Sequence, residues 1–181
     1  MADRPLNATA ASLLGFLHEG PKTGWDLVAT AQARIGDFWT LTRSQVYREL
    51  AAMATAGLVE AHERGRRDRQ PYAITEAGRA AFAAWVQQDP GPETIRFPLL
   101  LTTVFGSHLP PDLLATFVRR HRDAHVARLA GYEQLHARLA DGGPKDPYQM
   151  ATLTFGLAYE RAVLAWFEEL PPDTRGRDDD L

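Results

Sequence analysis

The densest group of side chains able to do chemistry is a run of arginines in the segment ERGRRDRQ. Four of them fall within six positions: Arg64, Arg66, Arg67 and Arg69. A guanidinium group is always charged, and its planar fork of N–H donors matches the oxygens of a phosphate or carboxylate. The run is therefore either a solvated loop or the tip of an element that binds an anion.

A second polar group lies upstream, where Thr42 and Gln45 form the T-x-x-Q pattern of a helix start with a capping box. Val46, Leu50 and Met53 follow at helical spacing and are expected to face a core. This spacing places the remaining polar residues of the first turns on the outer face and flank of the helix. They are Arg43, Ser44, Gln45, Tyr47 and Arg48. The helix is expected to present a hydrogen-bonding surface at its N-terminal end.

Two further helices are expected before this one. The first covers residues 7–18, where apolar side chains recur at helical spacing after the capping residue Asn7. The second opens at Thr23, whose partner in a capping box is Asp26, and ends near Ile35. The third helix, which begins at Thr42, is expected to end at Gly57.

The pattern then changes to two extended segments, LVEAHE and PYAIT, which flank the arginine run. Such an arrangement predicts a β-hairpin with the arginines in its turn. Another helix begins after Thr75. Three helices, a hairpin and a fourth helix form the order of a winged helix-turn-helix, so the expected fold is mainly α with a two-stranded β wing.

The chain is expected to divide at the Asp89-Pro90-Gly91-Pro92 break. Residues 1–89 would form the winged-helix domain, and residues 90–171 a helical domain with helices over 95–105, 111–139 and 148–170. Residues 172–181 are charged and nearly free of apolar side chains, which predicts a disordered tail.

The two long C-terminal helices suggest an assembly. The first repeats at the three-and-four spacing of a coiled-coil seam, at Val118, His121, His125, Arg128, Tyr132, Leu135 and Leu139. The last carries two apolar stripes, one at Tyr148, Thr152, Phe155, Tyr159, Ala162 and Trp166 and the other at Leu153, Leu157 and Leu164. A helix with two apolar sides is expected to be buried on both. A homodimer through the C-terminal helices would cover the second side.

Composition narrows the class of protein. The chain has 181 residues, no cysteine and a net charge of −3, which excludes disulfide scaffolds, thiol nucleophiles and a general polycation. Residues 43–79, however, carry seven basic and five acidic side chains. Neither a signal peptide nor a run of about 20 apolar residues is evident, so a cytoplasmic protein that is not in a membrane is expected.

Several stretches together resemble the PadR family of bacterial transcriptional regulators. They are LLGFLHEGPKTGWDL, SQVYRELAAMATAGLVE and RQPYAITEAGRAAFAAWV, followed by PLLLTTVFG and a long helix rich in Arg and His. The resemblance covers residues 6 to about 170. It implies a dimeric winged-helix protein that binds an operator in double-stranded DNA, usually as a repressor, and that in many members releases it when a small, often aromatic molecule binds.

The resemblance makes the helix from Thr42 the recognition helix. Arg43 and Gln45 are then candidates for reading base edges, with Tyr47 and Arg48 on phosphates. Ser44-Gln45 departs from the Pro-Gly or Ser-Gly start of many members, which affects the expected base preference. The wing residues Arg64, Arg66, Arg67 and Arg69 would contact phosphates or the minor groove. Candidates for lining an effector cavity are the aromatic residues Phe97, Tyr159 and Trp166.

A metal site, an enzyme and a protein-binding module are the other classes of function to consider. His121 and His125 share a helix face, as metal ligands often do, but the sequence offers no third ligand, so hydrogen-bonded or partly exposed histidines at the helix seam are expected and a metal site is not. No catalytic triad, carboxylate pair or phosphate loop is evident, so neither an enzyme nor a cofactor is expected. The remaining alternative is a winged-helix module that binds proteins and lacks specific DNA binding.

Overall fold

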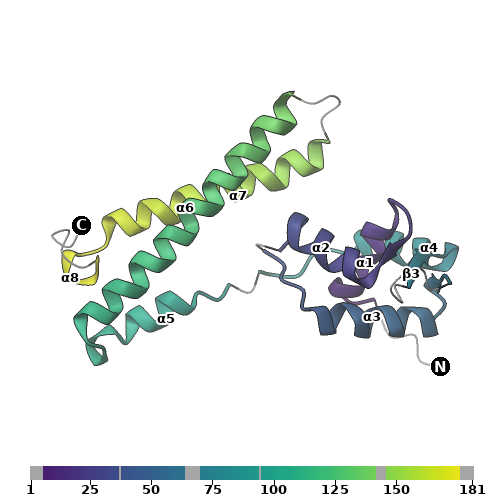
Figure 1. Ribbon diagram of the computed structural model, residues 1–181, viewed down its shortest axis with the longest axis horizontal. Helices are drawn as coiled ribbons and strands as arrows, with labels where there is room; N and C mark the ends of the chain where they lie inside the picture. Colours follow the sequence, from purple (N-terminus) through teal and green to yellow (C-terminus); the bar gives the residue numbers. More distant parts are fainter. Residues whose placement is uncertain (1–5, 37, 64–69, 94, 142–145, 176–181) are drawn as a thin grey trace. The chain divides into compact units, whose positions relative to one another are not determined.

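The computed structural model describes residues 6–36, 38–63, 70–93, 95–141 and 146–175. The chain forms two compact units, Met1–Pro92 and Glu93–Leu181, and each is described by itself. Figure 1 shows the helices and strands of both units with their labels.

The first unit contains four helices and a small sheet among its described residues. In chain order they are α1 (Ala8–Leu17), β1 (Lys22–Thr23), α2 (Gly24–Arg34), α3 (Arg43–Thr55), β2 (Val59–Ala61), β3 (Pro71–Ile74) and α4 (Glu76–Val86). The strand order is β1-β3-β2 and all pairs are antiparallel, with Lys22 opposite Tyr72 and Val59 opposite Ile74. The mainly helical winged-helix fold expected from the sequence is confirmed.

Capping residues explain where these helices begin. Asn7 accepts a hydrogen bond from the Ala10 amide, and Thr75 accepts one from the Gly78 amide. Thr23 and Thr42 each form a complete capping box, with Asp26 and Gln45 respectively. Such side chains satisfy amides that have no partner inside the helix, which stabilises a helix start by about 1 kcal/mol each.

The core of the first unit is formed by α1, α2 and α3, with Val59 of β2. Leu13 and Leu14 of α1 and Val46 and Leu50 of α3 are fully buried, and Met53 lies with them as expected from its spacing. Burial of each such side chain contributes about 1.5–3 kcal/mol. Because the buried line of α3 is fixed in this core, its opposite face is held toward solvent.

The strand β1 was not expected from the sequence. It has only two residues, too few for an alternating pattern, and Thr23 also serves as the N-cap of α2. Its pairing with β3 joins the start of α2 to the sheet.

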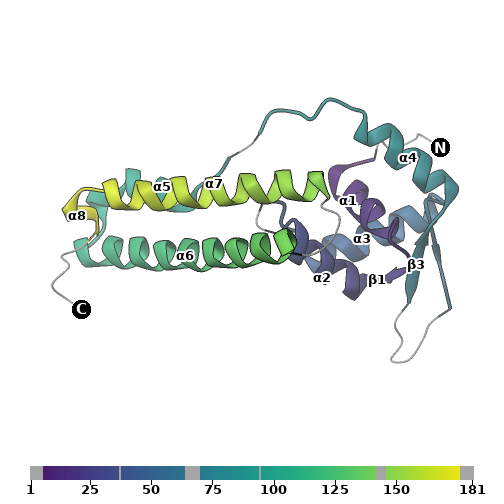
Figure 2. The same cartoon turned by 90° about the horizontal axis from the view of Figure 1, so that it is seen from above.

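The second unit is built on two long antiparallel helices, α6 (Pro111–Asp141) and α7 (Pro147–Glu169), which lie side by side in Figures 1 and 2. Among the described residues of this unit, three short helices accompany them: α5 (Pro98–Val104), η2 (Gly106–His108) and α8 (Pro172–Arg175). A second apolar core joins α5, α6 and the end of α7, and its buried members are Leu99, Leu114, Val118, Phe167 and Leu170.

Helix α5 begins three residues later than expected, at Pro98 instead of Ile95. A proline favours the first position of a helix and pushes the residue before it into an extended conformation. Phe97 is accordingly extended, with φ −115° and ψ 98°.

The prediction of a disordered tail was wrong for residues 172–175, which form α8. Leu170 is buried against α6, and the Thr174 hydroxyl and amide both donate to the Pro171 carbonyl oxygen. The buried leucine therefore anchors the segment although its own side chains are mostly polar. Residues 176–181 lie outside the described part of the chain.

The seam of α6 packs against α7 of the same chain. Val118 is buried and the six other seam residues are half-buried, whereas most of their neighbours on α6 are exposed. At Gly156 of α7, a Cβ atom would lie 2.8 Å from the Tyr132 ring, so the two helices approach closely there. His121 and His125 thus lie within the fold of one protomer.

The two stripes of α7 have different surroundings. Leu153 and Leu157 are buried in the interface with α6, as the sequence predicts for one stripe. On the other stripe, Tyr148 is 82% exposed and Phe155 is 65% exposed. Tyr159 and Trp166 of this stripe are half-buried, so a single chain leaves its N-terminal part, at Tyr148 and Phe155, uncovered.

Candidate nucleic-acid interface and aromatic pocket

The first turn of α3 presents polar side chains on a rigid support. Arg43 and Ser44 are exposed, and Gln45 is half-buried beside them. The Thr42 hydroxyl accepts from the Gln45 amide, while Gln45 Oε1 accepts from the Thr42 amide at 2.8 Å. The cap therefore holds the oxygen of Gln45 and leaves its side-chain N–H groups for other partners.

Arg43 lies over an aromatic ring. Its guanidinium carbon is 4.6 Å from the centre of the Trp25 ring, at the start of α2. This is a cation–π contact between neighbouring helices. Trp25 itself is 48% exposed, so both partners lie at the surface.

Tyr47 and Arg48 lie further along the same helix and are both exposed. Arg48 forms an ion pair of 3.4 Å with the buried carboxylate of Glu49. The other oxygen of Glu49 accepts a hydrogen bond from Asn7 Nδ2 at 3.1 Å. Because Asn7 also caps α1, Glu49 joins the two helices of the core, a role that the sequence did not indicate.

The four wing arginines, Arg64, Arg66, Arg67 and Arg69, lie outside the described residues. The described strands on either side of them are paired, and the His62 amide donates to the Pro71 carbonyl oxygen at 2.9 Å. The arginine segment therefore connects two strands of one sheet.

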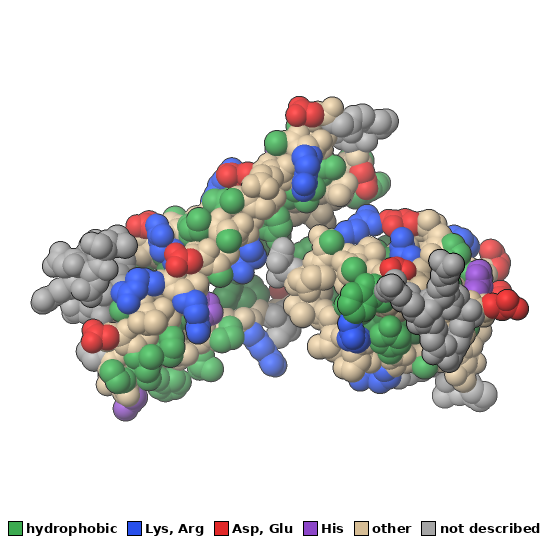
Figure 3. All heavy atoms as spheres, in the orientation of Figure 1, with side chains coloured by type: hydrophobic (Ala, Val, Ile, Leu, Met, Phe, Trp, Pro, Cys, Tyr) green, Lys and Arg blue, Asp and Glu red, His purple; other side chains and the backbone are tan. Residues whose placement is uncertain are grey.

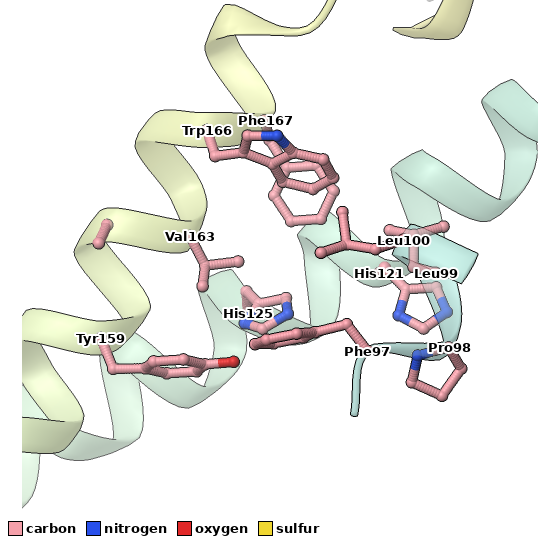
Figure 4. Close-up of a pocket in the computed structure, with 11 residues that line it drawn as sticks. Phe97, Pro98, Leu99, Leu100, His121, His125, Tyr159, Val163, Trp166 and Phe167 are labelled. Carbon is pink, nitrogen blue, oxygen red and sulfur yellow. The ribbon is translucent and has the colours of Figure 1, made fainter. Parts of the chain in front are cut away.

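A cavity of about 300 Å³ lies in the second unit (Figure 4). The three aromatic residues expected in an effector site, Phe97, Tyr159 and Trp166, all line it. The Phe97 and Tyr159 rings are stacked, with centres 6.3 Å apart and planes inclined by 13°. The Tyr159 hydroxyl points into the space between α7 and Phe97 in Figure 4.

Two histidines add polar groups to this cavity. His121 and His125 both line it, together with Pro98, Leu99, Leu100, Ala162, Val163 and Phe167. The sequence places these histidines on one face of α6. It gives no reason to expect Phe97 near them, because Phe97 is the N-cap residue of α5. A cavity lined by aromatic rings with a few polar groups suits a small aromatic ligand.

A buried carboxylate lies behind the cavity wall. Glu160 of α7 is only 2% exposed, and its oxygens lie 2.5 Å from His125 Nδ1 and 3.0 Å from Arg128 Nε. These contacts pair the buried charge, as burial requires. Glu160 fixes the orientation of the His125 ring, and the sequence gave no signal for this because the three residues come from two helices.

The environment of the cavity also shifts two pKa values. Burial raises the pKa of the Tyr159 hydroxyl, the Glu160 charge adds to the rise, and Arg128 opposes it. Burial lowers the pKa of His121, and the positive charges of Arg120, His125 and Arg128 act in the same direction. Both shifts favour neutral side chains in the cavity.

The described residues include no set of three or more His, Cys, Asp or Glu side chains placed to hold a metal ion. Across the same residues, no helix has the length and apolar character needed to cross a membrane.

Each half of the chain matches the model of a known protein family. Residues 13–84 match the model of the transcriptional regulator PadR-like family, and residues 95–171 match the model described as virulence activator alpha C-term. The chain is 26% identical over 170 residues to the negative transcriptional regulator PadR of Bacillus subtilis, covering 88% of this chain and 93% of that protein. It is 28% identical over 176 residues to the probable transcriptional regulator Rv1176c of Mycobacterium tuberculosis, with the same two coverages of 88% and 93%.

Solved structures share the fold. The crystal structure of Bacillus subtilis PadR in complex with operator DNA has a TM-score of 0.73 at 23% identity, covering 90% of this chain and 96% of that one. The structure of the same protein in complex with p-coumaric acid has a TM-score of 0.68 at 21% identity, covering 97% of this chain and all (100%) of that one. The winged-helix segment, residues 13–84, therefore belongs to the PadR-like family of transcriptional regulators.

Proposed function

We propose that this chain is a cytoplasmic, dimeric DNA-binding repressor that releases its operator when a small aromatic molecule binds. The observation that carries the DNA-binding part is the exposed polar start of α3, followed in the chain by two paired strands with four arginines in the sequence between them. A helix of this kind enters the major groove by its N-terminal end, and a wing contacts the adjacent backbone or minor groove.

Each DNA-contacting residue has a proposed role. Arg43 pairs with guanine, because its fork matches O6 and N7, while Gln45 offers its free side-chain N–H groups to a base edge. Ser44, Tyr47 and Arg48 contact the sugar-phosphate backbone. Phosphates are neutralised by the four arginines of the wing, Arg64, Arg66, Arg67 and Arg69.

The uncovered apolar surface of the second unit supports a dimer. Besides Tyr148 and Phe155 on α7, the exposed residues on and after α5 include Leu101, Val104 and Phe105. Figure 3 shows apolar side chains gathered at the end of the second unit where α5 lies. Large exposed apolar surfaces commonly mark an interface. A second copy would cover them and would place two recognition helices for a two-fold symmetric operator.

The cavity supports the release step. Phe97, Tyr159 and Trp166 offer aromatic faces, and the protonated Tyr159 hydroxyl is able to donate a hydrogen bond to an acceptor on the ligand. Bacillus subtilis PadR, which shares the fold, has been crystallised with p-coumaric acid. A ligand that binds the free dimer better than the DNA-bound dimer would shift the equilibrium toward release.

The test is fluorescence anisotropy of labelled DNA from upstream of the gene, at several salt concentrations. The wild type is compared with a variant in which Arg66, Arg67 and Arg69 are replaced by Ala. We expect binding that prefers this DNA over a random duplex, and a salt dependence that becomes weaker in the variant because fewer counterions are released.

The alternative is a winged-helix module that binds a protein partner. Equal and weak binding of both duplexes by the wild type at every salt concentration would contradict the operator-binding proposal. The protein-binding module would then be the better explanation of the fold.

A further inference from the structure

The start of α2 carries a large aromatic residue that the core does not use. Trp25 is 48% exposed and does not belong to the apolar core of the first unit, to which α2 contributes Leu27 and Ala31 instead. Its ring instead supports the Arg43 guanidinium, 4.6 Å away. The exposed position of this tryptophan therefore needs an explanation other than packing.

The residue before it has a similar relation to α3. A Cβ atom added to Gly24 would lie 2.6 Å from Cε1 of Tyr47, closer than side chains approach one another. The Tyr47 ring therefore lies directly against the backbone at Gly24, and only glycine leaves room for it. Consecutive residues of α2 thus support two residues of α3.

Both sides of this contact are held in place. Thr23 forms the capping box of α2 and pairs with Pro71 in the sheet, so Gly24 follows directly on an anchored residue. On the other side, Arg43 follows Thr42, the cap of α3. The contact therefore joins two helix starts whose backbones are fixed independently.

The contact with Trp25 uses none of the hydrogen-bond donors of Arg43. A cation–π contact is an attraction between the positive charge and the ring face, and it forms no hydrogen bond to the guanidinium N–H groups. Within the described residues, the Arg43 head group forms no ion pair or hydrogen bond, and its cation–π contact is with Trp25. A guanidinium held in this way loses less conformational freedom when it binds a partner.

From these contacts we infer that Gly24 and Trp25 are positioning residues that pre-orient Tyr47 and Arg43 for DNA. We call this pair the α2 platform. The inference rests on the proposed DNA-binding function, and it assigns to α2 a share in operator selectivity without base contacts of its own. Trp25 acts on DNA through Arg43, and Gly24 acts through Tyr47.

The test is a double-mutant cycle with the full-length protein. The dissociation constants for the upstream duplex and for a random duplex are measured by fluorescence anisotropy at one fixed salt concentration. The variants are Trp25→Ala, Arg43→Ala and the double variant, with Trp25→Phe as the conservative replacement. Thermal unfolding of each variant checks that the fold is retained, as expected for a half-exposed residue.

We expect Trp25→Ala to weaken binding to the upstream duplex about two- to fivefold, the range that corresponds to an exposed cation–π contact. Trp25→Phe should retain most of the affinity, because its ring also has a π face. In the Arg43→Ala background, Trp25→Ala should have no further effect. The preference for the upstream duplex over the random duplex should fall in Trp25→Ala, in Arg43→Ala and in the double variant.

Other outcomes separate the two proposals. If the wild type shows no preference for the upstream duplex, the DNA-binding proposal fails first. If the wild type prefers that duplex but Trp25→Ala weakens binding equally with and without Arg43, the positioning inference is overturned and Trp25 contacts DNA itself. An unchanged affinity of Trp25→Ala would also overturn it.

A second variant tests the glycine half of the platform. Gly24→Ala forces the Tyr47 ring away, and we expect weaker binding of both duplexes because Tyr47 is proposed to contact the backbone. Gly131→Ala is the control, since an added Cβ atom there meets nothing within 4 Å. The double variant Gly24→Ala, Tyr47→Ala should bind DNA with the same affinity as Tyr47→Ala alone. It should not bind more tightly than Gly24→Ala. A further loss in the double variant would contradict the role of Gly24 through Tyr47.

Discussion

Nε of Arg128 on α6 lies 3.0 Å from Oε1 of Glu160 on α7, and Glu160 is almost completely buried. His125 binds the other oxygen of the same carboxylate. The polar residues in the seam of α6 therefore have a defined partner on the neighbouring helix. One buried carboxylate holds two basic side chains and a wall of the cavity together.

Removal of this carboxylate should destabilise the second unit. We expect Glu160→Ala to lower the free energy of unfolding by about 2–3 kcal/mol, because His125 and Arg128 lose their buried partner. Urea unfolding followed by tryptophan fluorescence measures the effect. Glu133→Ala is a matched control, since Glu133 also joins α6 to α7 through Arg161 but both side chains are at least half exposed. Its effect should stay below about 1 kcal/mol, and equal effects of the two variants would contradict the prediction.

The lowered pKa of His121 predicts a dependence of stability on pH. The unfolded chain binds a proton near the ordinary value of 6.5, whereas folded His121 resists protonation because it is partly buried near other positive charges. Its contribution is therefore present above pH 6.5 and is lost as the pH falls toward the folded pKa. His121→Gln should reduce the slope of unfolding free energy against pH below 6.5. An NMR titration of the His121 ring that gives a pKa above 6.5 would contradict this sign.

The exposed aromatic stripe of α7 predicts a change in assembly. Phe155→Asp places a charge on the proposed dimer surface and should convert a dimer to a monomer in size-exclusion chromatography with light scattering. Thr154→Asp is the control, because Thr154 is also exposed but lies on the flank of the helix. A wild-type protein that is monomeric at micromolar concentration would contradict the proposed dimer.

The cavity predicts selective binding of small aromatic molecules. Phe97→Ala removes the ring stacked on Tyr159, so the affinity for a small aromatic ligand should fall about two- to tenfold. Isothermal titration calorimetry measures this affinity. Phe38→Ala is the control, because Phe38 lies in the first unit, is 58% exposed and does not line the cavity. Equal losses in both variants would show that the ligand binds elsewhere.

Sequence reasoning succeeded where structure depends on neighbours along the chain. The capping boxes of Thr23 and Thr42 involve residues three positions apart, and the buried line of α3 follows from helical spacing alone. Such features need no knowledge of distant segments. Aromatic residues in the second half were also identified as candidates, but sequence could not join Phe97 to Tyr159.

Tertiary structure decided the rest, because the contacts join residues far apart in sequence. Glu160 lies 35 positions from His125 and 32 from Arg128, so no local pattern relates them. No local pattern joins Trp25 to Arg43, and the two-residue strand β1 exists only because β3 pairs with it. Local hydrogen bonding and spacing determined the helices and the order of the fold. Only the packing of those helices determined which side chains share a cavity, an ion pair or a surface.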